Sequence, residues 1–179
     1  MALARVARDA LQLDELRWVP AGQPWQKSRR ISAAAHRQAM VALAIDGEPR
    51  FALERCELER DGPSYTLDTV RALQAAEPGA RWYLILGGDQ YAGLHTWRDW
   101  RELLERVELA VANRPGPTPP VHPDVQRHPH RVVPLPMLDV ASTEVRRRVA
   151  AGEAIDDLVP AAVARYIARH SLYTEGEAH

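Results

Sequence analysis

The sequence has little net charge, almost no cysteine and no long hydrophobic run. Its 23 lysines and arginines nearly balance its 24 acidic residues, so no overall positive field points to a nucleic-acid partner. The single cysteine, Cys56, cannot form an internal disulfide and suits a reducing compartment. No apolar run approaches the roughly 20 residues of a membrane helix. We therefore expect a cytoplasmic protein with no nucleic-acid and no membrane partner.

The chain is expected to form one domain. Its 179 residues are enough for one well-packed core and too few for two. The N-terminus is not a secretion signal, because an acid appears by Asp9 and no long apolar stretch follows. We expect the domain to span residues 1–173, with a proline-rich surface loop at about 115–130 and a tail at 174–179. A monomer or a small homo-oligomer is expected.

Short apolar segments alternate along the chain with segments of helical periodicity. Helices are expected over residues 2–13, 32–45, 64–76, 97–106, 142–151 and 160–170. Ser32 and Ser64 are the expected N-caps of the second and third helices. Strands are expected over residues 16–21, 50–60, 81–89, 107–116 and 131–138. The continuous apolar run within 81–89 is typical of a parallel strand covered on both faces. This order predicts an α/β fold with a mostly parallel sheet flanked by helices.

Residues suited to nucleotide binding follow the predicted strands. The segments after the strands read PAGQPWQK, DGPSYT, GGDQ, NRPG and DVASTEVRRR. They contain glycines, hydroxyls, an aspartate and several cations. In sheets of this kind, ligands bind beyond the C-terminal ends of the strands. We therefore expect these segments to gather at one edge of the sheet and to form the functional site there.

Residues 141–148, ASTEVRRR, begin a predicted helix with two hydroxyls and three consecutive arginines. Positive charge at a helix N-terminus opposes the helix dipole, so folding alone does not favour it. An anion bound at that end would explain the cluster, because free N–H groups and a cation together form an anion site. A capped surface helix with solvated arginines is the alternative interpretation, and it fits Arg147 best.

These segments resemble those of bacterial nicotinate-nucleotide adenylyltransferase, in the family's order and over nearly all of residues 1–173. The most specific motifs are Ser-Tyr-Thr at 64–66, Gly-Gly-Asp at 87–89 followed by Trp97, and the hydroxyl-arginine start of a helix at 142–146. The resemblance implies a Rossmann-like nucleotidyltransferase fold. It also implies transfer of AMP from ATP to nicotinic acid mononucleotide, giving deamido-NAD and pyrophosphate in NAD biosynthesis. Mg²⁺ would enter bound to ATP, without a ligand set on the protein.

The resemblance assigns expected roles to individual residues. Lys27 and Arg146 would neutralise phosphate charge, and they are the expected catalytic residues. ATP would contact Gly87, Gly88, Asp89, Arg114, Ser142, Thr143 and Arg146. Nicotinic acid mononucleotide would stack on Trp97 and place its carboxylate at Thr66. A simpler role stays open for several of them: a turn for Asp89, core packing for Trp97, helix capping for Thr66 and a solvated loop for Lys27.

The chain departs from the family pattern at three places. Ala141 stands where the family usually has a serine, and Gln26 stands before Lys27 where a histidine is common. The family's first strand and its histidine-x-glycine-histidine turn have no counterpart, because Met1 aligns just after the second histidine. We expect the central strand of the sheet to be absent, which would leave a gap of roughly 10 Å between its neighbours. A start site assigned too late is the expected cause, with a truncated copy as the alternative.

Two other functions stay open. One is a related nucleotidyltransferase acting on a phosphopantetheine-type acceptor, although Trp97 together with Thr66 favours nicotinate. The other is a non-catalytic nucleotide-binding remnant, which the missing histidines allow. The histidines of the proline-rich loop, His122, His128 and His130, match no metal-ligand spacing and are expected to face solvent. No protein-held metal is therefore expected.

Overall fold

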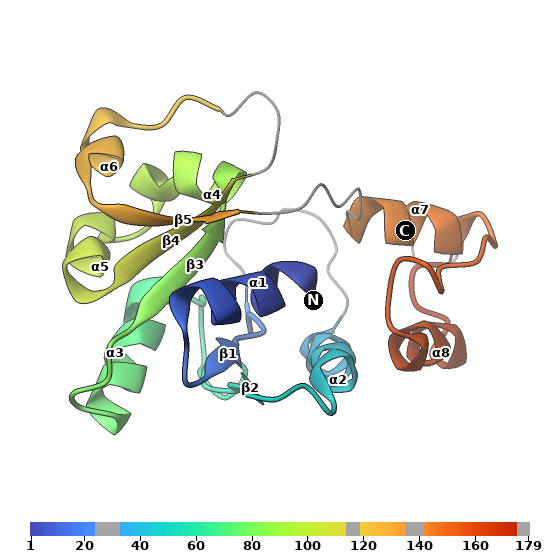
Figure 1. Ribbon diagram of the computed structural model, residues 1–179. Helices are drawn as coiled ribbons and strands as arrows, with labels where there is room; N and C mark the ends of the chain where they lie inside the picture. Colours follow the sequence, from blue (N-terminus) through green and yellow to red (C-terminus); the bar gives the residue numbers. More distant parts are fainter. Residues whose placement is uncertain (24–32, 114–118, 135–141, 175–179) are drawn as a thin grey trace.

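The computed structural model describes residues 1–23, 33–113, 119–134 and 142–174. Two predicted site residues, Lys27 and Arg114, lie outside these ranges. The elements, in chain order, are α1 (Ala2–Leu11), β1 (Leu16–Trp18), α2 (Ala34–Ile45), β2 (Phe51–Leu53), α3 (Thr66–Ala76), β3 (Tyr83–Gly87), α4 (Gly88–Ala92), the 3₁₀ helix η1 (Leu94–Thr96), α5 (Trp100–Arg106), β4 (Glu108–Asn113), α6 (Pro123–Arg127), β5 (His130–Pro134), α7 (Ser142–Ala150) and α8 (Ala161–Arg169) (Figure 1).

The described strands pair in parallel and form two sheets. β1 pairs with β2, with Leu16 opposite Phe51. In the second sheet β4 lies between β3 and β5, with Ile85 of β3 opposite Ala110 of β4. Helices flank these sheets, so the predicted mixed α/β fold with parallel strands is confirmed (Figure 1). The absence of the family's first strand stays a prediction.

The three-stranded sheet is covered on both faces. Successive residues of a strand point to opposite faces, which separates Leu109 from Ala110 on β4. Leu109 packs in a cluster with residues of α3, η1, α5 and α6, among them the fully or almost fully buried Leu67, Leu94, Leu103 and Val125. On the opposite face, Ala110 and Val133 pack against Ala7 of the amphipathic helix α1. The strand ends that carry the candidate site are therefore held by a packed core.

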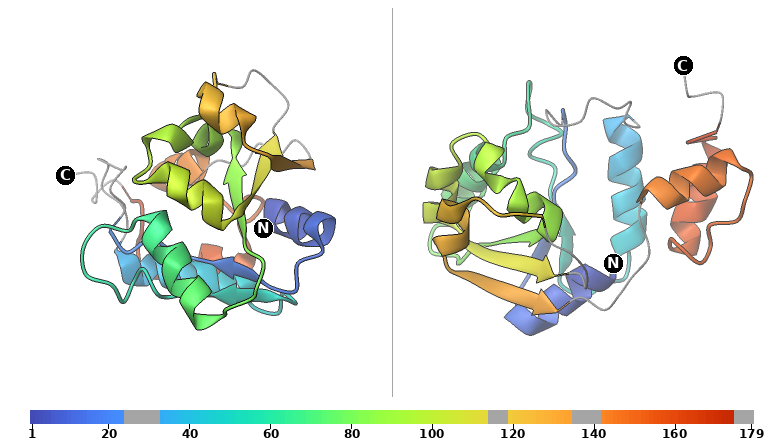
Figure 2. Two further views of the ribbon diagram at one scale, coloured as in Figure 1. Left: turned by 90° about the vertical axis from the view of Figure 1, so that its left-hand side faces the viewer. Right: turned by 90° about the horizontal axis from the view of Figure 1, so that it is seen from above.

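α7 and α8 pack on each other and on α2. Val145 of α7 and Ile167 of α8 are buried in one cluster, to which Met40 and Leu43 of α2 contribute. Seen from above, α2 lies between the strands and the α7–α8 pair (Figure 2). Within the described ranges, no helix is long and apolar enough to span a bilayer.

Two strand predictions are wrong in detail. β3 is only partly buried apart from Leu86, although continuous burial was expected. The reason is that β3 pairs with β4 alone among the described strands. β2 ends at Leu53 instead of continuing to residue 60. The chain turns there, and Glu57 becomes buried with its carboxylate accepting a 2.7 Å hydrogen bond from the hydroxyl of Thr69.

Neither predicted serine cap is found in the structure. The N-cap of α3 is Tyr65 and that of α2 is Ala33, and neither end has a side-chain cap. Ser32 lies outside the described residues. Ser64 accepts hydrogen bonds from a different segment of the chain, which a local sequence pattern could not indicate.

The range predicted as a proline-rich loop contains a short helix, α6. Pro123 occupies its first turn, and Nδ1 of His122 accepts a hydrogen bond at 3.2 Å from the N–H of Asp124. Val125 is fully buried in the core, and this burial stabilises the helix. His122 is only partly exposed and stacks on His95, with ring centroids 5.2 Å apart, so the expectation that it faces solvent is wrong.

Candidate functional site

β3 leads directly into α4 through Gly87 and Gly88, at the C-terminal end of the strand. Neither glycine has a positive φ, so the turn itself does not require glycine. A Cβ placed on either residue would meet no described atom within 4 Å. As far as the described residues go, the space over this stretch of backbone is open, and a nucleotide can approach it closely. Asp89 is exposed in the first turn of α4 beside them.

Thr66 is the first residue of α3, and Tyr65 before it is the N-cap. Helix capping by the Thr66 side chain, the simpler role considered for it, is therefore wrong. The first N–H groups of a helix have no acceptor within the helix, and this end has no side-chain cap. The start of α3 can therefore donate N–H groups to a carboxylate.

Trp97 directly follows η1 and is partly buried. Its ring packs against the same core cluster as Trp82 and Trp100, so the core-packing role is supported in part. The guanidinium carbon of the next residue, Arg98, lies 4.7 Å from the ring centroid of Tyr65. The segments that carry Trp97 and Thr66 therefore adjoin, as the predicted nicotinate contacts require.

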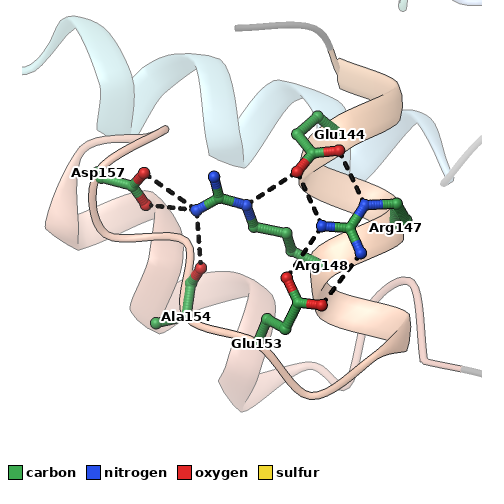
Figure 3. Close-up of polar contacts among 6 residues, drawn as sticks. All are labelled: Glu144, Arg147, Arg148, Glu153, Ala154 and Asp157. Carbon is green, nitrogen blue, oxygen red and sulfur yellow. Dashed lines mark hydrogen bonds and ion pairs between the residues drawn. The ribbon is translucent and has the colours of Figure 1, made fainter.

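Two of the three consecutive arginines of α7 are neutralised locally. Arg147 forms ion pairs at 2.9 Å with both Glu144 and Glu153 (Figure 3). Arg148 pairs with Glu144 at 3.0 Å and with Asp157 at 2.9 Å. The two guanidinium groups hold the pKa of Glu144 at about 2. Both arginines lie in the last turn of this nine-residue helix, where positive charge complements the helix dipole, so neither needs a bound anion.

Arg146 differs from its two neighbours. Its guanidinium carbon lies 5.7 Å from the ring centroid of Tyr173, and the side chain is exposed. No acidic side chain in the described ranges forms an ion pair with it. Of the three charges, the one on Arg146 is therefore the most available to an anion. Ser142 and Thr143 are the first two residues of α7, so Thr143 lies within the helix and is not its N-cap.

The N-terminal end of α7 is the end nearer to the three-stranded sheet (Figure 1). α7 follows the C-terminal end of β5 through residues outside the described ranges. Gly87 ends β3, which runs parallel to β4 and β5, and Gly88 and Asp89 follow directly as the first residues of α4. We predicted that Arg146 and Lys27 share one cleft with the segment 87–89. This stays a prediction, because Lys27 is not among the described residues.

Two side chains that contact the segment after β1, those of Ser64 and Arg37, were not predicted from the sequence. The hydroxyl of Ser64 accepts hydrogen bonds from the backbone of Gly22 and Gln23. Arg37 of α2 donates to the carbonyl oxygen of Gly22 at 3.0 Å, and burial lowers the pKa of its guanidinium. The contacting residues are 15 to 42 positions apart in the chain, so no local spacing could have indicated them.

Comparison with known proteins indicates the family to which the chain belongs. The cytidylyltransferase-like family model matches residues 1–148. A protein of Methylibium petroleiphilum named "Probable nicotinate-nucleotide adenylyltransferase" is 50% identical over 97% of this chain and 84% of its own length. The chain belongs to the nicotinate-nucleotide adenylyltransferase family. A relative of the same name from Streptomyces coelicolor is 42% identical, over 90% of this chain and 86% of its own length.

Solved structures share the architecture of this adenylyltransferase-family chain. A Plasmodium falciparum nicotinic acid mononucleotide adenylyltransferase complexed with NaAD matches with a TM-score of 0.74 at 18% identity. The match covers 96% of this chain and 90% of that one. The same protein complexed with APC gives a TM-score of 0.74 at 17% identity, over 96% of this chain and 88% of that one. At such low identity the likeness shows the fold alone, which is the predicted Rossmann-like nucleotidyltransferase fold.

Proposed function

We propose that this chain transfers AMP from ATP to nicotinic acid mononucleotide, giving deamido-NAD and pyrophosphate in NAD biosynthesis. The observation that carries the proposal is the 50% identity, over 97% of the chain, to a relative named for this activity. The geometry supports it, because the open backbone at Gly87 and Gly88 follows a parallel strand, as a nucleotide site requires. We place the reaction in the cytoplasm, with the protein as a monomer or small homo-oligomer.

The reaction needs no nucleophile from the protein. A phosphate oxygen of the mononucleotide attacks the α-phosphorus of ATP, and the bond from that phosphorus to the β-phosphate oxygen breaks. Pyrophosphate leaves with the electron pair. Catalysis of this kind rests on positioning and on neutralising charge. Arg146 and Lys27 supply positive charge between two anionic substrates, which lowers their repulsion and stabilises the charge that develops.

Each substrate has its own set of contacts. The nucleotide of ATP lies over Gly87 and Gly88, and Asp89 accepts a hydrogen bond from a ribose hydroxyl. Ser142, Thr143, Arg114 and Arg146 contact the ATP phosphates. For nicotinic acid mononucleotide, Trp97 stacks on the electron-poor pyridine ring, and the N–H groups at the start of α3, at Thr66, bind the pyridine carboxylate.

We propose that Mg²⁺ enters with ATP. In the described parts of the chain, no group of three or more His, Cys, Asp or Glu side chains is placed to hold a metal ion. A single exposed carboxylate such as Asp89 offers too few oxygen ligands for a dedicated site. The ATP phosphates would provide the remaining ligands, and the ion would supply charge neutralisation on the phosphates.

The test is product formation. Purified protein is incubated with ATP, Mg²⁺ and nicotinic acid mononucleotide, and deamido-NAD is quantified by liquid chromatography. The same assay with phosphopantetheine as acceptor examines the competing nucleotidyltransferase function. Two forms are assayed: residues 1–179, and the same chain extended at its N-terminus by an apolar strand and a histidine-x-glycine-histidine turn. Deamido-NAD from either form supports the proposal. No deamido-NAD from both, or faster transfer to phosphopantetheine, overturns it.

A further inference from the structure

His122 immediately precedes α6, and its imidazole ring caps the helix. Its Nδ1 accepts a hydrogen bond at 3.2 Å from the backbone N–H of Asp124. A ring nitrogen accepts only through a lone pair, so Nδ1 carries no proton and the proton of the neutral ring is on Nε2. The side-chain cap of α6 therefore exists only while His122 is neutral.

Two aromatic neighbours hold the ring of His122 in this position. It stacks on His95 of η1, with ring centroids 5.2 Å apart, and it lies edge-on to Trp100 of α5, with centroids 5.9 Å apart. Nδ1 of His95 lies 3.1 Å from the carbonyl oxygen of Ala92, and a carbonyl can only accept, so this Nδ1 does carry a proton. His95 can therefore take up a second proton on Nε2 and keep its hydrogen bond, whereas a second proton on His122 removes the cap.

The charges around His122 do little to stabilise a cation there. The carboxylate of Asp124 attracts one, but it is already paired with Arg101 of α5 at 3.1 Å and with Arg127 of α6 at 2.9 Å. The hydrogen bond from Arg101 is the main cause that lowers the pKa of Asp124, so this carboxylate stays ionised at the pH values where histidine titrates. Two arginines thus share the one carboxylate, and the N-terminal end of a helix itself opposes a positive charge.

Two further histidines lie at the C-terminal end of α6. His128 is the C-cap, and burial lowers the pKa of its imidazole. Nδ1 of His130 lies 3.4 Å from the hydroxyl of Tyr91, which also donates to the carbonyl oxygen of Val125 at 3.4 Å. Either histidine can add a pH dependence of its own, so an experiment on His122 has to separate the two ends of the helix.

We propose that His122 is a proton-sensitive latch that holds the N-terminal end of α6 closed. Uptake of a proton at Nδ1 removes the acceptor of the Asp124 N–H and places a cation against His95, so α6 opens from this end. A proton that binds only the open form shifts the equilibrium toward it, so the latch is closed above about pH 6.5 and weakens as the pH falls below that value. Because His95 lies in η1, opening also removes a contact of the segment that leads to Trp97. The latch needs no substrate and does not depend on the proposed function.

Ring ¹⁵N spectra of residues 1–179 at pH 8 provide a first test, because they report which nitrogen of each imidazole carries the proton. His122 should show a proton on Nε2 and His95 a proton on Nδ1. A proton on Nδ1 of His122 would overturn the latch, because that nitrogen could not accept the hydrogen bond from Asp124.

The second test measures the hydrogen-exchange protection factor of the Asp124 amide, which corrects for the intrinsic pH dependence of exchange. In the wild type it should fall about tenfold between pH 7.5 and pH 5.5, the limit for one proton over one pH unit below about pH 6.5. His122→Asn keeps a good cap acceptor that does not titrate, so its protection factor should change less than about twofold, and His122→Ser replaces it if that variant does not fold. His128→Asn, the same substitution at the other end of α6, is the matched control and should keep the wild-type response. An unchanged response in His122→Asn, a lost response in His128→Asn, or no protection in the wild type at pH 7.5 would overturn the latch.

Discussion

The guanidinium of Arg98 lies over the ring of Tyr65, with 4.7 Å from its central carbon to the ring centroid. This contact joins the chain after η1 to the start of α3. The sequence neighbours of the pair are Trp97 and Thr66, the two residues predicted to contact nicotinate. Because the two touching segments carry the predicted nicotinate contacts, a substitution at Trp97 or Thr66 should raise the KM for nicotinic acid mononucleotide more than the KM for ATP.

Replacing Trp97 with alanine should raise the KM for nicotinic acid mononucleotide more than the KM for ATP. Loss of a stacked ring is worth ~1–3 kcal/mol by analogy with base–aromatic stacking, or roughly fivefold to 150-fold. The measurement is a pair of steady-state KM values. Trp100→Ala is the control, because Trp100 packs against the same core cluster and should lower stability without this selectivity. Equal effects on both substrates in Trp97→Ala would indicate a purely structural role.

Replacing Arg146 with alanine should lower kcat/KM for ATP strongly. A hydrogen bond to a charged group contributes ~1.5–3 kcal/mol, so a decrease of roughly tenfold to 150-fold is expected. Arg147→Ala removes the same charge from the next position, yet that side chain is already paired with Glu144 and Glu153. Its kcat/KM should stay within about twofold of the wild type. If the two variants lose the same activity, net charge and not a specific contact is responsible.

Glu144 makes the stability of α7 depend on pH. Its two arginine partners hold the pKa of the folded-state carboxyl at about 2, below its ordinary value of 4.5. A depressed folded-state pKa contributes stability that is present above pH 4.5 and is lost as the pH falls toward 2. The stability difference between the wild type and Glu144→Gln should therefore shrink between pH 5 and pH 3 in urea unfolding. A difference that stays constant over that range would contradict this coupling.

Features that depend on neighbours in the sequence could be predicted. The periodicity of residues 2–13 predicted α1, and the apolar run of residues 107–116 predicted β4. The acid-to-arginine spacing from Glu144 to Arg147 and Arg148 is the i,i+3 and i,i+4 spacing of helical ion pairs. It could have shown from the sequence that Arg146, unlike Arg147 and Arg148, is not spaced for a helical ion pair with Glu144.

Features that depend on distant contacts could not be predicted. Ser64 has the sequence context of a helix cap, yet its acceptor oxygen serves Gly22 and Gln23. The helix α6 forms within a proline-rich stretch because Val125 reaches the core of another part of the chain. In both cases the local pattern is compatible with a loop or a cap, and the energy that decides between structures comes from burial or from a long-range hydrogen bond.

Among the described strands, β1 and β3 each have one edge that pairs with no other strand. Within the described ranges β1 pairs with β2 alone and β3 with β4 alone. The guanidinium carbon of Arg17 on β1 lies 5.3 Å from the ring centroid of Trp82, just before β3, so side chains connect the two edges. The indole N–H groups of Trp18 and Trp82 are buried without a hydrogen-bond partner among the described residues. Leu84 and Ile85 are only partly buried.

An N-terminal extension, made of an apolar strand and a histidine-x-glycine-histidine turn, should raise both the stability and the turnover of residues 1–179. A parallel strand between β1 and β3 would satisfy backbone groups on both edges. It would also complete the burial of Leu84 and Ile85, for which full burial is worth about 1.5–3 kcal/mol each. The histidines would add charge stabilisation at the transferred phosphate. The measurement compares the melting temperature and deamido-NAD formation of three forms: the unextended chain, the extended chain, and an extended chain with two prolines in the new strand. Because proline cannot donate a backbone hydrogen bond, the form with two prolines should melt and turn over like the unextended chain. Identical melting and turnover in all three would show that no strand inserts between β1 and β3.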